Sequence, residues 1–180
     1  VEGKEKVVNA TIGALLDDDG ELIVLSSVND VFKNLSPKEF AEYAPISGTP
    51  EFKKAVKQDA LRGYEPKGFV EASATPGGTG AIRNTIANYT DRGDSVLVAD
   101  WYWSPYGTIA AEQGRKVETF AFFNDERKFN VEDFKIKAES LLSRQQRLVI
   151  ILNTPAHNPT GYSLTTEDWN NVKTVLEALP

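Results

Sequence analysis

The chain has 180 residues, of which 41% are hydrophobic and 26% charged, and its formal net charge is -6. A chain of this length can bury a sizeable core, whereas its acidic balance argues against a nucleic-acid backbone as the main partner. It contains no cysteine and one histidine, which excludes a disulfide framework and Cys-ligated zinc and argues against a His-rich metal site. No apolar run approaches the roughly 20 residues that cross a bilayer, and the chain starts without a signal-peptide pattern. We therefore expect a cytoplasmic protein with no membrane segment.

Strand and helix patterns alternate along the chain. Helices are expected where a capping residue, an early proline or a glycine turn precedes apolar residues at helical spacing, namely from Ser36, Thr49, the glycines 77–80, Ser104, Asn130 and Thr165. The expected strands are 69–75, 95–99, 116–121 and 148–152. The last is continuously apolar, as a strand buried on both faces should be. This alternation predicts an α/β fold, a three-layer α/β/α sandwich with a mostly parallel sheet.

The stretch Pro76-Gly77-Gly78-Thr79-Gly80 lies between an expected strand and an expected helix. Glycines allow a ligand to approach the backbone, and free amides at a helix start favour an anion such as phosphate. The stretch is not a Walker loop, and Arg83 stands where a dinucleotide-binding fingerprint needs glycine. A tight turn without a ligand is the alternative interpretation.

Two further segments follow the carboxyl ends of expected strands, where open α/β sheets bind ligands. The first, residues 100–106, contains four aromatic residues that could stack on a planar ring or simply cover the rim of the sheet. The second, residues 153–165, contains two prolines, the only histidine and Asn158. The Asn158 amide could contact a hydroxyl or a carboxylate. His157 could act directly on a ligand, or it could only hydrogen-bond the backbone.

These motifs resemble the fold-type I pyridoxal-phosphate aminotransferases, closest to the aspartate and aromatic branch. In chain order, "VNATIGALLDDDGELIVLSSV" is similar to the family's Asn-Leu-Gly-Ile-Gly segment and "EYAPISGTPEF" to its Tyr-x-x-x-x-Gly-x-x-x-Phe segment. "TPGGTGAIR" resembles its phosphate loop, and "HNPTGYSLTTEDW" resembles its Asn-Pro-Thr-Gly motif. The resemblance implies an N-terminal segment of the small domain over residues 1–25 and the first part of the cofactor-binding large domain over 26–180.

The resemblance also implies roles for individual residues around a pyridoxal 5'-phosphate cofactor. Gly78 and Thr79 would bind its phosphate, with Gly77 shaping the loop, and Trp103 would stack on its ring. Asn158 would donate to the oxygen of the ring. We further expect the Asn158–Pro159 peptide bond to be cis.

On the substrate side, the resemblance implies that Asn158 and the backbone amide of Gly13 hold the α-carboxylate. Tyr43 would reach the cofactor phosphate of the neighbouring subunit, so that the full-length protein is expected to be a homodimer with shared active sites. Tyr106 stands where the aspartate branch has a histidine. The implied reaction transfers an amino group between an amino acid and a 2-oxo acid, without nucleic-acid or membrane partners.

Family members are more than twice as long, and the 180 residues end before the family's Schiff-base lysine, its ring-nitrogen aspartate and its carboxylate-binding arginine. We therefore expect no catalytic residue in this chain, no activity from it alone, and exposed strand edges and apolar surface. Two other functions stay open: a non-catalytic ligand-sensing module with the same cradle, and a pyridoxal-phosphate lyase on the same fold.

Overall fold

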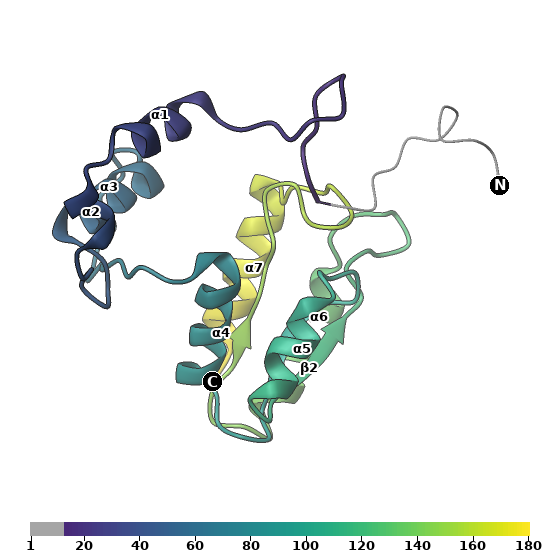
Figure 1. The fold of residues 1–180 in the computed structure, drawn as a ribbon. Coiled ribbons are helices and arrows are strands. Elements are labelled where there is room, and N and C mark those ends of the chain that lie inside the picture. The colour runs from purple at the N-terminus through teal and green to yellow at the C-terminus, as the bar shows by residue number, and fades with distance from the viewer. Residues whose placement is uncertain (1–12) are drawn as a thin grey trace. The chain divides into compact units, whose positions relative to one another are not determined.

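The computed structural model describes residues 13–180, and the chain divides into two compact units, Val1–Ala72 and Ser73–Pro180. Figure 1 shows their helices and strands in chain order. Over residues 13–180, every helix is too short or too polar to cross a membrane.

The first unit contains three helices, α1 (Ser26–Asn34), α2 (Pro37–Ala41) and α3 (Pro50–Leu61). Two of them begin where the sequence predicts. Ser36 and Glu39 form a capping box at α2, in which the Glu39 carboxylate accepts the Ser36 amide at 2.8 Å. Thr49 caps α3 by accepting the Phe52 amide at 3.2 Å. No residue of these three helices is buried, so the unit has local capping but little core of its own.

The second unit alternates helices with strands as predicted. In chain order its elements are α4 (Gly77–Tyr89), β1 (Ser95–Ala99), α5 (Pro105–Glu112), β2 (Lys116–Phe120), α6 (Val131–Leu142), β3 (Val149–Ile150) and α7 (Thr166–Ala178). The strands form one parallel sheet in the order β2-β1-β3. Ser95 pairs with Lys116 at one end of the β1–β2 ladder, and Ala99 pairs with Phe120 at the other.

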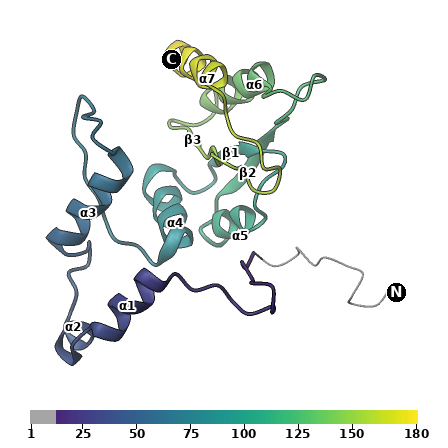
Figure 2. The same ribbon diagram turned by 90° about the horizontal axis from the view of Figure 1, so that it is seen from above.

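Helices cover both faces of this sheet, which confirms the three-layer sandwich (Figure 2). Because successive strand residues point to opposite faces, β1 feeds two apolar clusters. Leu97 and Ala99 join a cluster rich in phenylalanine that includes residues of α6 and α7. Val96 and Val98 join a second cluster with Ile86 of α4 and residues of α5.

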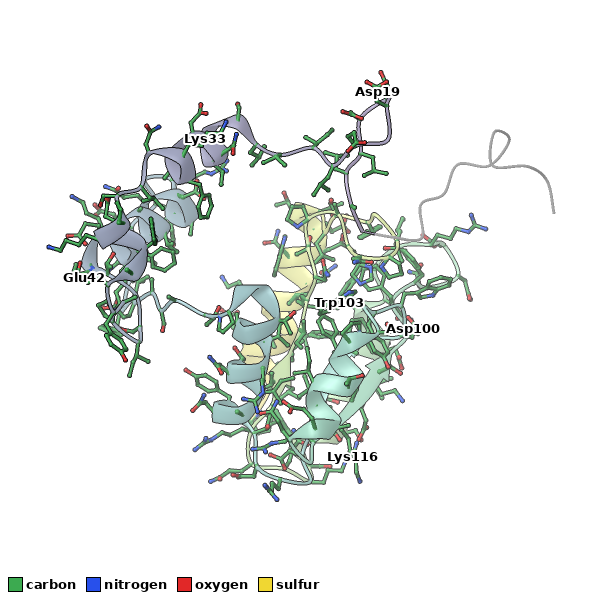
Figure 3. All side chains as sticks on the ribbon, in the orientation of Figure 1. Asp19, Lys33, Glu42, Asp100, Trp103 and Lys116 are labelled. Carbon is green, nitrogen blue, oxygen red and sulfur yellow. The ribbon has the colours of Figure 1, made fainter. Side chains whose placement is uncertain are left out.

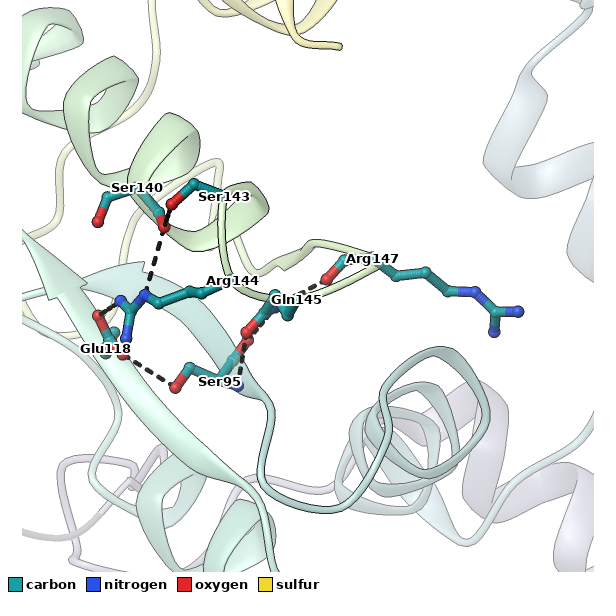
Figure 4. Close-up of polar contacts among 7 residues, drawn as sticks. All are labelled: Ser95, Glu118, Ser140, Ser143, Arg144, Gln145 and Arg147. Carbon is teal, nitrogen blue, oxygen red and sulfur yellow. Dashed lines mark hydrogen bonds and ion pairs between the residues drawn. The ribbon is translucent and has the colours of Figure 1, made fainter.

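Polar side chains close the amino-terminal end of the sheet (Figure 4). Ser95 donates its hydroxyl to Glu118 at 3.0 Å, and Glu118 also accepts from the Arg144 guanidinium. The Gln145 side chain exchanges two hydrogen bonds with the Ser95 backbone, at 2.9 and 3.0 Å. The loop after α6 is thereby fixed to the first residue of β1.

Two predicted strands differ from the structure. Residues 69–75 form no strand, which makes that prediction wrong. Only Val149 and Ile150 of the predicted strand 148–152 pair in the sheet, and Ile150 is half-buried rather than buried. The physical reason is the same for both, because a strand needs a hydrogen-bonded neighbour. Among the described residues, 69–75 have no such neighbour, and β3 has one on one side only, β1.

The free side of β3 faces an open groove of about 270 Å³ between the strand and α4. Its lining is mostly apolar, with Ile150, Ile151 and Leu152 on one side and Ala81, Ile82 and Thr85 on the other. Leu176 of α7 is 44% exposed. The described chain thus leaves apolar side chains and a strand edge uncovered, as expected from the sequence.

Candidate functional site

The first turn of α4 presents backbone amides that donate to no group within residues 13–180. Gly77 adopts a φ of +66°, and its amide donates to the Thr75 carbonyl at 2.7 Å. The Gly80 amide donates to the Pro76 carbonyl at 3.2 Å. Among the described residues, neither the Gly78 amide nor the Thr79 amide donates a hydrogen bond. Gly77 therefore shapes the turn, while Gly78 and Thr79 leave their donors at a helix start, where an anion is favoured.

There is room for a ligand above this turn. A methyl group added at Gly77 or at Gly78 would meet no heavy atom within 4 Å. The side chain of Thr79 is exposed, so that its hydroxyl is available beside the two free amides. The sequence-predicted phosphate loop thus has unengaged donors and is open beside Gly77 and Gly78.

The same edge of the sheet carries the segments that follow β1 and β3. These strands are parallel, so their carboxyl ends meet at one edge. The early turns of α4 lie there too, because Ala81, Ile82 and Thr85 line the groove together with Ile150–Leu152. In Figure 1 the first turn of α4 and the loop after β3 lie at the upper end of this unit.

Trp103 belongs to the aromatic segment after β1, whose position Asp100 fixes. The Asp100 carboxylate accepts the backbone amides of Trp101 and Phe122, each at 2.9 Å. Trp103 is half-buried and packs edge-on against Tyr106, with ring centroids 5.5 Å apart at 81°. Figure 3 shows Asp100 and Trp103 above Lys116, which lies near the lower end of the unit. Trp103 is thus held by packing at the edge that carries the phosphate loop.

Not every aromatic residue of this segment serves a platform. Tyr106 is buried and stacks on Tyr102 at 6.2 Å, and its hydroxyl accepts from the Asn153 side chain at 3.5 Å. Trp101 is 56% exposed. Tyr106 therefore fills the rim of the sheet, which is one of the two functions weighed for the segment, whereas Trp103 is half-buried and its stacking on a ring stays a prediction.

The loop after β3 contains two cis peptide bonds. Asn158–Pro159 is cis, which confirms the prediction, and Thr154–Pro155 is cis as well. Asn158 is exposed, and among the described residues its side chain makes no hydrogen bond. Its amide is thus unengaged at the same edge as Trp103 and the first turn of α4.

His157 has a different environment from its neighbour in the chain. It is 3% exposed, and its ring stacks on Phe122 with centroids 4.4 Å apart. Its Nδ1 lies 2.8 Å from the Thr160 hydroxyl. Burial lowers the pKa of His157, and the charge of Asp100 and a hydrogen bond with the Trp101 backbone oppose this only in part. His157 is therefore a buried neutral residue that contacts the protein rather than solvent.

Sequence reasoning missed Phe122. The pair Phe122-Phe123 lies one residue beyond the end of β2. Aromatic residues so close to the carboxyl end of that strand are a signal that would have placed the pair at this edge. The sequence could not show that the Phe122 amide donates to Asp100 or that the Phe122 ring stacks on His157.

The two remaining predicted residues belong to the first unit. Gly13 is exposed, and a methyl group added there would meet nothing within 4 Å. Tyr43 is fully exposed just beyond α2. The structure thus groups Gly77, Gly78, Thr79, Trp103 and Asn158 within the second unit, and it describes Gly13 and Tyr43 within the first.

Comparisons with known proteins agree with this arrangement. The sequence profile of the family "Aminotransferase class I and II" matches residues 5–179. The chain therefore belongs to the class I and II aminotransferase family. Its similarity to curated relatives extends to the cytoplasmic aspartate aminotransferase of Dictyostelium discoideum, with 33% identity over 94% of this chain and 39% of that protein. The aromatic-amino-acid aminotransferase of Paracoccus denitrificans is 28% identical over 96% of this chain and 45% of its own length.

A solved structure gives the same result. The aminotransferase from Anaerococcus prevotii DSM 20548 matches with a TM-score of 0.92 and 43% identity, over 97% of this chain and 43% of that chain. The chain spans about two fifths of the length of these relatives.

Proposed function

We propose that this chain is the N-terminal part of a pyridoxal-phosphate-dependent aminotransferase that acts on aspartate or on an aromatic amino acid. Family membership and the names of the relatives support the reaction class. The observation that carries the proposal is the pair of unengaged amides at Gly78 and Thr79, at the sheet edge that also carries Trp103 and Asn158.

The described residues fit the cofactor. Gly78 and Thr79 would hold its phosphate, since amides at the start of a 13-residue helix favour a dianion. Trp103 would lie against the ring face, and the Asn158 amide would donate to the ring oxygen. When bound, pyridoxal phosphate supplies an electron sink for the substrate's α-carbon. The chain's own contribution is to bind and orient it.

The substrate side of the proposal rests on membership of the family. Asn158 and the Gly13 amide would hold the α-carboxylate of the amino acid, and the fully exposed Tyr43 would reach the phosphate of a second subunit. The complete protein would accordingly be a cytoplasmic homodimer with shared active sites. Residues 1–25 would belong to its small domain and 26–180 to its large domain.

A binding experiment tests the cradle. We expect the chain to bind pyridoxal phosphate reversibly and more tightly than pyridoxal, because the free amides of α4 contact only the phosphate. Thr79→Val should weaken pyridoxal phosphate and leave pyridoxal unchanged. Thr85→Val, on the same helix with its hydroxyl bonded to the Ala81 carbonyl at 2.9 Å, is the matched control. Equal affinity for both compounds, measured by calorimetry, would contradict the proposal.

We also propose that residues 1–180 alone do not transaminate. A lysine that anchors the cofactor must lie beside its ring, yet Lys116 begins β2 at the opposite end of the sheet (Figure 3). Lys128 pairs with Glu126 at 2.9 Å, and the other lysines of this unit lie on α6 and α7. Borohydride reduction with the cofactor, followed by peptide mapping, should give scattered substoichiometric labelling. One stoichiometrically labelled lysine together with turnover of aspartate would refute this.

A further inference from the structure

His157 connects two segments of the candidate site that lie far apart in the sequence. One is the 100–103 segment after β1, which ends at Trp103, and the other is the turn 157–161 after β3, which contains Asn158. His157 closes the turn through its backbone, because its amide donates to the Tyr162 carbonyl at 2.8 Å and its carbonyl accepts the Gly161 amide at 2.6 Å.

The side chain of His157 holds the turn a second time. Its Nδ1 lies 2.8 Å from the Thr160 hydroxyl, and that hydroxyl oxygen accepts the Tyr162 amide at 3.2 Å. On the other side, the His157 ring stacks on Phe122 with centroids 4.4 Å apart, and the Phe122 amide donates to Asp100 at 2.9 Å.

The Thr160 contact indicates the tautomer. The Thr160 oxygen accepts the Tyr162 amide, so its own proton is free to be donated to Nδ1. In the neutral imidazole Nδ1 then accepts, and the proton is carried by Nε2. Asp100 is the charged group that faces the ring, and the Tyr162 phenol packs edge-on against Phe122, on which the ring is stacked.

Phe122 completes the connection. Its amide donates to Asp100 at 2.9 Å and its ring stacks on His157 at 4.4 Å. The 100–103 segment and the turn after β3 are thus joined through the His157 side chain, which is 3% exposed. No ligand can touch His157 directly, so its effect on a ligand must pass through the residues that it holds.

We propose that His157 is a positioning residue, whose neutral Nε2–H imidazole fixes Asn158 and Trp103 relative to each other for binding the cofactor ring. This inference rests on the proposed function of the site. It predicts an effect of His157 on the residues that contact the ring and none on those that contact the phosphate. Gly78 and Thr79 lie on α4, and His157 makes no described bond to that helix.

The test compares two ligands in a small set of variants. His157→Phe keeps an aromatic ring against Phe122 and removes the hydrogen bond at Nδ1, whereas Thr160→Val keeps the imidazole and removes both its Nδ1 partner and the acceptor of the Tyr162 amide. Each should weaken pyridoxal phosphate by about three- to tenfold, the effect of one or two net hydrogen bonds, and leave inorganic phosphate unchanged. Thr160→Ser should restore the wild-type affinity. Thr174→Val on α7, whose hydroxyl bonds the Asn170 carbonyl at 2.9 Å, should change neither ligand.

A second measurement does not depend on the ligand. Because the chain has one histidine, the imidazole resonances in its ¹⁵N spectrum belong to His157 alone. We expect the Nε2–H tautomer, a pKa below the ordinary value of about 6.5, and shifted Asn158 side-chain resonances in Thr160→Val. An Nδ1–H tautomer, unchanged Asn158 resonances, or equal losses for pyridoxal phosphate and inorganic phosphate would overturn the inference.

The two proposals fail in different ways. If the wild-type chain binds neither ligand, the proposed function is wrong, and the tautomer and the Asn158 resonances still decide the role of His157. If His157→Phe does not fold, Thr160→Val and Thr160→Ser carry the comparison, with folding checked by circular dichroism.

Discussion

Gln145 pairs with Ser95 as a neighbouring strand residue would. Its Nε2 donates to the Ser95 carbonyl at 2.9 Å, and its Oε1 accepts the Ser95 amide at 3.0 Å. The β1–β3 ladder begins one residue later, at Val96 and Val149. A side chain thus extends the pairing of β1 by one position before the first residue of β3.

We predict that Gln145→Ala lowers the free energy of unfolding by about 2 kcal/mol, because it leaves the part-buried Ser95 amide and carbonyl unpaired. Gln146→Ala is the matched control, since Gln146 is exposed and makes no described hydrogen bond. Urea unfolding of the three proteins gives the comparison. Equal midpoints for the two variants would show that this pairing does not stabilise the sheet.

The hydrogen bonds of Asp168 predict that the stability of the fold depends on pH. Its Oδ2 accepts the Thr165 amide at 2.8 Å and the Thr165 and Tyr162 hydroxyls, each at 2.9 Å. Burial raises the pKa of Asp168, but these hydrogen bonds outweigh burial and the pKa is lowered. A carboxyl group with a lowered pKa stabilises the fold above its unfolded pKa of about 3.9, and this stabilisation is lost as the pH falls through the folded value.

Asp168→Asn should therefore cost about 1 kcal/mol of unfolding free energy at neutral pH, and the difference from wild type should shrink as the solution is acidified. Glu167→Gln removes a charge from the same helical turn and is the control, because the Glu167 side chain makes no hydrogen bond among the described residues. A difference for Asp168→Asn that stays constant down to acidic pH would refute the interpretation.

Gly78 and Gly80 should respond differently to alanine. A methyl group at Gly80 would lie 2.7 Å from Cδ of the rigid Pro76 ring, whereas at Gly78 it would meet nothing within 4 Å. Gly80→Ala should therefore destabilise the chain by about 1–3 kcal/mol through overpacking. Gly78→Ala should leave stability intact or raise it slightly but weaken phosphate binding, because the methyl group occupies the cradle. If Gly78→Ala binds phosphate as tightly as the wild type, or loses binding only because it is less stable, this prediction is wrong.

The ion pair of Glu118 and Arg144 should contribute little. The Arg144 side chain lowers the pKa of Glu118 through a direct hydrogen bond, yet the two side chains are 34% and 51% exposed. Solvent screens such a pair, so Glu118→Gln should cost at most about 1 kcal/mol and less at high salt. Glu139→Gln, on the exposed side of α6, is the control. A cost well above that limit that persists in 1 M salt, a concentration at which the Debye length is about 3 Å, would contradict the screening argument.

Local sequence patterns predicted the elements whose ends are set locally. Asn130 accepts the Asp133 amide at 3.1 Å and Thr165 accepts the Asp168 amide at 3.1 Å, so both helix starts could be inferred from three or four adjacent residues. Residues 69–75 were predicted wrongly because a strand depends on a partner elsewhere in the chain. β3 is shorter than predicted for the same reason.

The candidate site follows the same division. The segments around Gly78, Trp103 and Asn158 could be located from glycine, aromatic and proline patterns at strand ends. The contacts of Asp100, Phe122 and His157 could not, because they join residues 22 to 35 positions apart through hydrogen bonds and ring stacking. No period in the sequence encodes such contacts.

All five residues of β1 are buried, and this has a consequence for how the strand finds its alignment. Apolar residues face both sides, so a slip by one residue would exchange the members of the two clusters without exposing an apolar side chain. Polar contacts remain to set the alignment. Gln145 holds the residue at the start of β1, Ser95, and the amide of Phe122 holds Asp100, just beyond its end. A slip of the strand would break the hydrogen bonds at both of its ends. The polar residues that border the strand, rather than its apolar core, therefore select one alignment.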